Sequence, residues 1–278
     1  MKNRNILGLF IILFFAIQYN LSAKNLAPSG NDKTMMEFNS YLKTVNLDGG
    51  KILNKDFLNK FIQLSTEENW YDNIKFWVSA QWGIKEYDGL ISKQYGLKGE
   101  ELTTPITEKR PKKIMNGNLF GISYDGVNNF SENLDVKVQQ PLSMLLVFSG
   151  DKNTGENFLI DAKGDRGCQI SVEKNNAGES ELLIKSAGEI RVKGLGDGIN
   201  IVYIEFNLKN SRVFINGQLA FTGIIGKVGM DGLVIGKGNI NDKVKYFNGV
   251  MYETGIINNY ISDEARTGLF NLMKEIYQ

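Results

Sequence analysis

The chain has 278 residues with 32 Lys or Arg against 31 Asp or Glu, so its net charge is +1 at neutral pH. This balance gives no electrostatic basis for binding nucleic acid or an anionic membrane surface. The chain has no histidine, which excludes His-based catalytic triads, His-ligated zinc and histidine acid–base chemistry, and its single cysteine, Cys168, cannot form a disulfide within the chain.

Residues 1–23 have the three parts of a secretory signal peptide. "MKNR" is positively charged, "ILGLFIILFFAI" (6–17) is apolar, and "LSA" (21–23) offers small residues for cleavage. The apolar part is shorter than the ~20 residues of a membrane-spanning helix. We therefore expect cleavage and a protein that is secreted, periplasmic or at the cell surface; an uncleaved membrane anchor is the alternative.

A polar linker (24–34) precedes a segment at 35–111 that we expect to be a small α-rich cap. Apolar residues recur there at helical spacing in two stretches, Met35, Phe38, Leu42 and Val45, then Phe57, Leu58, Phe61 and Ile62. Residues 70–82 allow a third helix or a strand that ends at the turn of Gly83. An exposed connection rich in charge and proline follows at 99–118.

Five aromatic residues cluster between positions 70 and 82: Trp70, Tyr71, Phe76, Trp77 and Trp82. Exposed aromatic rings stack on sugars, whereas aromatic residues at helical spacing more often form a buried seam. We expect the buried seam, between the cap and the remainder of the chain.

From residue 119 onward, short apolar or alternating runs separated by Gly, Asn and Asp predict strands. The runs are 119–124, 142–148, 157–162, 168–173, 181–186, 189–194, 200–208, 211–215, 219–222, 232–236 and 248–257. They predict a mainly β domain at 112–278, an antiparallel two-sheet jelly-roll sandwich. A helix at 262–277, with Ser262 as its N-cap, closes the chain.

Four motifs in this region resemble laminin-G-like jelly rolls of the concanavalin A-like lectin and glucanase superfamily. They are "ISYDGVNNF" (122–130), "RVFINGQLAF" (212–221), "GLVIGKG" (232–238) and "YFNGVMYETGIINNYISDEAR" (246–266). The resemblance covers about 119–278 and implies the fold more than the function, because this scaffold hosts lectins, hydrolases and structural domains. It also implies that Glu253 forms hydrogen bonds to backbone near the closing helix.

Two kinds of binding site are candidates. Tyr203, Glu205 and Asn207 share one face of a predicted strand and offer a polar surface for sugar hydroxyls, with a solvated sheet face as the alternative. Calcium is the possible cofactor, through loop oxygens of Asp125, Asn128, Asn241 and Asp242, although turn formation also explains these residues. Asn216 and Gly217 are expected to form a hairpin turn.

No strand carries the E-x-D-x-x-E pattern of retaining glucanases in the superfamily. Glu179 and Glu181 lie in a polar turn where solvated charge is the ordinary explanation, and "GLGDG" (194–198) lacks the residues of a phosphate loop. We therefore expect a secreted, non-catalytic recognition module that binds a glycan or an extracellular protein through rim loops or a concave face. The alternatives are a glycan-active hydrolase of the same superfamily and a structural component of a surface assembly.

Overall fold

The computed structural model describes residues 30–150, 157–162, 167–240 and 243–278. The predicted signal peptide and the candidate calcium ligands Asn241 and Asp242 lie outside these residues. No helix in the described ranges is both long enough and apolar enough to span a membrane.

Two helices begin the described chain, α2 (Gly30–Leu47) and α3 (Lys55–Glu67). α3 starts at Asn54, whose side-chain oxygen accepts a hydrogen bond from the Phe57 backbone N–H at 2.9 Å. Its apolar stripe, which includes Phe57 and Phe61, is fully buried. Both predicted helices of this region are present. α3 buries its predicted stripe, whereas α2 buries Tyr41 and Val45 and leaves Met35 of its predicted stripe exposed.

The segment after α3 forms strands and not a third helix. β2 (Ile74–Ser79) pairs antiparallel with β20 (Asn248–Asn258), in the register Trp77 to Gly255. A run of aromatic and branched residues buried on both faces suits a central strand, although its apolar positions also fit helical spacing. Strands therefore accompany the helices within 35–111, and the boundary at 111 stays a prediction.

Eighteen strands of the described chain form one hydrogen-bonded sheet, and β18 (Lys237–Ile240) and β19 (Lys243–Tyr246) form a separate hairpin. The strands before position 140 are β1 (Lys51–Ile52), β2, β3 (Gly83–Tyr87), β4 (Leu90–Tyr95), β5 (Glu101–Thr103), β6 (Lys112–Asn116), β7 (Leu119–Asp125) and β8 (Ser131–Val138). Those after it are β9 (Leu142–Gly150), β10 (Asn157–Asp161), β11 (Gln169–Lys174), β12 (Ser180–Lys185), β13 (Glu189–Val192), β14 (Asn200–Phe206), β15 (Ser211–Ile215), β16 (Gln218–Gly223), β17 (Met230–Ile235) and β20.

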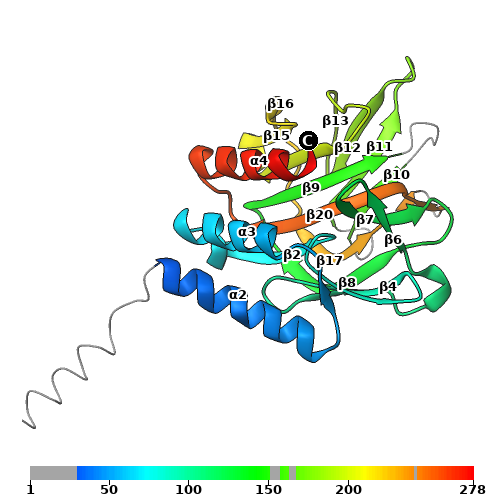
Figure 1. The fold of residues 1–278 in the computed structure, drawn as a ribbon. Coiled ribbons are helices and arrows are strands. Elements are labelled where there is room, and N and C mark those ends of the chain that lie inside the picture. Colours follow the sequence, from blue (N-terminus) through cyan, green and yellow to red (C-terminus); the bar gives the residue numbers. More distant parts are fainter. Residues whose placement is uncertain (1–29, 151–156, 163–166, 241–242) are drawn as a thin grey trace, which may run out of the picture.

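The pairing has two long antiparallel runs. One is β16-β15-β14-β9-β20, and the other is β13-β12-β11-β10-β17-β8-β5-β4-β3-β1. β20 continues to β2 and β7, and β6 links β7 to β4, so the sheet curls round on itself (Figure 1). The mainly β, antiparallel prediction is confirmed, and all eleven predicted strands are present. The finer prediction of two separate sheets is not confirmed, because hydrogen bonds connect the runs.

Side chains alternate between two cores along β9 and β14. Leu146 and Val202 face a core between the two runs of strands, whereas Leu145 and Tyr203 face a second core that includes helical residues. Three helices lie along this second face (Figure 1). They are α2, α3 and α4 (Asp263–Tyr277), and α4 is the predicted closing helix capped by Ser262.

The aromatic cluster at 70–82 is buried, as predicted. Trp70, Tyr71, Trp77 and Trp82 join the second core, with Phe61 of α3 against Trp77 at a ring separation of 4.5 Å. Phe76 points to the first core. None of the five rings is exposed for stacking on a sugar.

Candidate functional site

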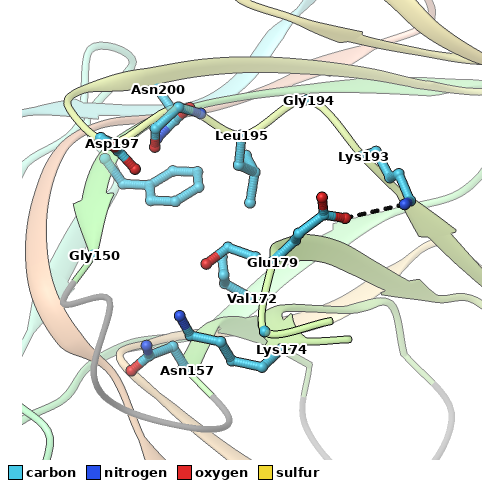
Figure 2. A pocket seen from close by; sticks show the side chains of 14 residues that line it. Gly150, Asn157, Val172, Lys174, Glu179, Lys193, Gly194, Leu195, Asp197 and Asn200 are labelled. Carbon is cyan, nitrogen blue, oxygen red and sulfur yellow. Dashed lines mark hydrogen bonds and ion pairs between the residues drawn. The ribbon is translucent and has the colours of Figure 1, made fainter. Parts of the chain in front are cut away.

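A cavity of about 520 Å³ opens at the end of the sheet where the two runs of strands separate (Figure 2). We call it the rim pocket. Phe148 of β9, Val172 of β11 and Leu195 supply its apolar surface. The other lining residues are Gly150, Asn157, Lys174, Gly178, Glu179, Ser180, Lys193, Gly194, Gly196, Asp197 and Asn200. The volume lies within the range of small-molecule sites, and most of the lining is polar or glycine.

Glu179 lies in the turn between β11 and β12 and is held by two donors. Asn175 Nδ2 donates to its carboxylate at 3.0 Å, and Lys193 Nζ lies 3.1 Å away. The hydrogen bond from Asn175, followed by that from Lys193, holds the pKa of Glu179 below its usual value. Glu179 is therefore ionised at neutral pH.

Asp197 reaches the rim pocket from the loop between β13 and β14. Figure 2 shows its carboxylate and that of Glu179 on different walls of the cavity. The buried amide of Asn200 holds this loop, because its Oδ1 accepts the Gly196 N–H at 2.7 Å and its Nδ2 donates to the Gly196 and Gly198 carbonyls, each at 3.1 Å. The position of Asp197 is thus fixed by the first residue of β14.

Asn216 and Gly217 form the predicted hairpin turn between β15 and β16, with φ angles of 53° and 86°. The turn also supports the rim pocket. Asn216 Oδ1 accepts the Ile201 N–H at 2.8 Å, and its Nδ2 donates to Asn200 Oδ1 at 3.3 Å.

The three predicted sugar-binding residues lie away from the rim pocket. Tyr203 is fully buried against Phe270 of α4, with ring centroids 6.3 Å apart. Glu205 is 2% exposed and binds Arg212 at 2.5 Å and Arg266 at 3.1 Å. Asn207 is half-buried just after β14. Because the closing helix packs on this face, Tyr203 and Glu205 have no access to a ligand in this conformation.

The candidate calcium residues near β7 serve a turn in the structure. The Asp125 carboxylate accepts backbone N–H groups of Val127, Asn128 and Asn129 at 2.9 to 3.2 Å. Partial burial acts to raise the pKa of Asp125, but these donors outweigh it and hold the pKa below its usual value. Within the described residues, no three Asp, Glu or Cys side chains gather to hold a metal ion.

A second, more open groove of about 690 Å³ runs along β5 and β8. Its acids include Glu100, whose pKa is raised by burial, and Glu101. Glu101 is paired with Lys93 at 2.8 Å, and Glu100 accepts the Lys98 N–H within its own turn at 3.0 Å. The rim pocket is the more enclosed of the two cavities, and we therefore take it as the candidate site.

No family model and no curated protein matches this chain. Among solved structures, a variant of a GH54 α-L-arabinofuranosidase soaked with 4-nitrophenyl α-L-arabinofuranoside matches with a TM-score of 0.50 and 13% identity, over 68% of this chain and 52% of that one. Trypanosoma rangeli sialidase with 2,3-difluorosialic acid matches with a TM-score of 0.54 and 12% identity, over 80% and 39%. The chain thus spans about half the length of the arabinofuranosidase and less of the sialidase. At these identities the likeness concerns the fold.

The neighbours contradict the expectation of a non-catalytic recognition module that is not an enzyme, because both are described as glycoside hydrolases. They support the mainly β fold, but they do not identify a laminin-G-like domain. In the sequence we looked for two acids on one strand. The rim pocket takes Glu179 and Asp197 from two separate turns, which no strand pattern reveals.

Proposed function

We propose that this protein is a glycan-active hydrolase whose active site is the rim pocket. The observation that carries the proposal is the pair of carboxylates, Glu179 and Asp197, on different walls of one cavity. Two acids that flank a glycosidic bond are the usual requirement for its hydrolysis. The hydrolase neighbours add support, since they share this fold.

The environment of Glu179 supports one of the two roles. Asn175 and Lys193 keep Glu179 ionised, as a nucleophile or base at the anomeric carbon requires. Asp197 is the second carboxyl group, and in this proposal it transfers a proton to the leaving oxygen as the glycosidic C–O bond breaks. Water supplies the hydroxyl group at the anomeric carbon and the proton that restores Asp197.

We also propose that the scaffold is a laminin-G-like jelly roll and that the protein acts after export. The tight turn at Asn216 and Gly217 and the opposed runs of strands around one core support this scaffold. The leader pattern of residues 1–23 supports export. Purification of the mature protein from the exported fraction of its native cell, with a new N-terminus near residue 24, tests the second point.

Hydrolysis of a panel of glycans tests the function. The panel includes arabinan, arabinoxylan and sialylated oligosaccharides, and release of reducing sugar is measured for wild type and for Glu179→Gln and Asp197→Asn. We expect turnover on at least one glycan and a loss of about 100-fold or more in each variant. Glu189→Gln, an exposed acid on β13 outside the pocket, is the control and retains turnover. No turnover on any glycan, or full turnover in both variants, would contradict the proposal.

A further inference from the structure

The charges around the rim pocket are unequally paired. Lys193 lies 3.1 Å from Glu179 and 3.8 Å from Glu181, so carboxylates neutralise its ammonium group. Lys174 also lines the pocket, yet within the described part of the chain no carboxylate lies within 4 Å of its ammonium group. Among the described residues, the charge of Lys174 is therefore not paired with a carboxylate.

Strand alternation directs Lys174 toward the pocket. Lys174 ends β11 opposite Ser180 of β12, and it lies on the same face as Val172, which also lines the cavity. Glu173, between them, points to the other face and pairs with Arg191 at 2.8 Å. Figure 2 shows the Lys174 side chain running along the wall that also carries Asn157.

Lys174 and the two acids can contact different parts of one bound sugar. In Figure 2 the Lys174 side chain runs toward Asn157, whereas the Glu179 carboxylate is turned toward Lys193 and Asp197 lies beside Asn200. A sugar ring between the acids can therefore present a substituent to Lys174 without displacing either acid. A neutral hydroxyl group gains little from an ammonium ion that water already solvates, whereas an anionic substituent gains charge-assisted hydrogen bonds beside an apolar surface.

We propose that the rim pocket selects a sugar unit that carries one negative charge, a carboxylate or a sulfate ester, and that Lys174 binds this group. The inference rests on the rim pocket as the glycan site of the proposed function and names its substrate class. Lys174 is here a specificity residue, and the acids remain Glu179 and Asp197. A single lysine provides one point charge, so the preference weakens as ionic strength rises.

Calorimetric binding tests this inference without any need for turnover. All proteins carry Asp197→Asn, and the ligands are hexuronic acid oligosaccharides, the same oligosaccharides with their carboxyl groups reduced to alcohols, and sulfated galactan oligosaccharides. At low salt we expect at least one anionic ligand to bind about tenfold or more tightly than the reduced ligand. Adding Lys174→Gln abolishes this preference, whereas adding Lys209→Gln, at an exposed lysine outside the pocket, preserves it.

Equal affinity for the anionic and reduced ligands, or a preference that survives Lys174→Gln, would overturn the inference. The two anionic ligands show which charged group Lys174 accepts. Failure here is distinct from failure of the proposed function: a protein that hydrolyses neutral glycans and shows no preference for charge remains a hydrolase. A protein that binds acidic glycans through Lys174 but hydrolyses none retains the inferred specificity and loses the enzymatic role.

Discussion

Asn216 Nδ2 donates a hydrogen bond to Asn200 Oδ1 at 3.3 Å and so joins the hairpin turn of β15 and β16 to the loop that carries Asp197. A residue that the sequence marked only as part of a turn thus supports the candidate active site. The amide of Asn200 is the centre of this network, since it also binds the backbone of Gly196 and Gly198.

Replacing Asn200 tests this support. Asn200→Ala leaves the Gly196 N–H and the Gly196 and Gly198 carbonyls without their partner, and we expect it to lower the free energy of unfolding by about 1–3 kcal/mol. Because the loop positions Asp197, glycan turnover should fall more than this stability loss explains at a temperature where the variant is fully folded. Urea denaturation and kcat/KM are the two measurements. Asn210→Ala, at an exposed asparagine outside the pocket, is the matched control, and equal turnover in both variants would contradict the role of Asn200.

Glu253 makes stability depend on pH. Its carboxylate is buried, accepts a hydrogen bond from Trp77 Nε1 at 2.9 Å, and is also bonded to the hydroxyl groups of Ser79 and Tyr277. Burial, opposed by these donors, raises the pKa of Glu253 to about 8. The resemblance implied backbone partners for this residue, whereas these partners are side chains of β2 and α4.

A folded-state pKa above the unfolded value stabilises the protein below the unfolded pKa, and this stability is lost as pH rises through the folded pKa. We therefore expect the free energy of unfolding to fall between pH 5 and pH 8 by on the order of a few kcal/mol. The chain has no histidine to titrate in this window, so the slope reports on Glu253 together with Glu100, whose pKa is also raised by burial. Urea denaturation across the window checks it. Glu253→Gln should flatten the curve, and an unchanged slope in that variant would assign the effect to other groups.

The polar face of β14 should matter for stability and not for glycan binding. Glu205→Ala removes a partner of Arg212 and of Arg266, and Arg266 is a largely buried residue of α4. We expect a loss of about 2–3 kcal/mol, below the usual cost of breaking a buried pair because Asp263 still contacts Arg266 at 2.6 Å. Affinity for glycan should stay within twofold of wild type in calorimetry. A large loss of glycan affinity in a folded Glu205→Ala variant would contradict this prediction and indicate that this face binds the glycan.

The N-terminal segment should be required for folding. Without residues 24–111, β20 loses its β2 partner, and the face of β9 and β14 loses Trp77, Phe61 and their neighbours. We expect the fragment 112–278 to be insoluble or to unfold without a cooperative transition in circular dichroism. A soluble fragment with a sharp thermal transition would show that 112–278 is an independent domain.

Local patterns predicted much of this fold. The eleven alternating or apolar runs all form strands, and Ser262 caps the closing helix. Both features depend on residues close together in the sequence, so a local pattern is enough to predict them. β8, "SENLDVKV", was missed because polar residues fill most of its length. β2 was ambiguous because a strand buried on both faces loses its alternation.

The candidate site was less predictable. Glu179 and Asp197 each lie in a polar turn, where solvated charge is the common outcome, and the strand register that brings the turns together involves residues far apart in sequence. The packing of α4 over Tyr203 and Glu205 is likewise a tertiary contact, which the alternation of residues along a strand cannot predict. The segment "GLGDG" gave a partial indication, because its glycines permit a tight loop that carries Asp197. Nothing in the sequence paired this loop with Glu179.

The most direct test of the proposed hydrolase is release of reducing sugar by Glu179→Gln beside wild type and Glu189→Gln, on the glycan that the wild-type protein hydrolyses best. The account predicts that Glu179→Gln loses about 100-fold or more of kcat, while Glu189→Gln retains the wild-type rate. Equal rates for the three proteins, with folding unchanged, would contradict the rim pocket as the active site.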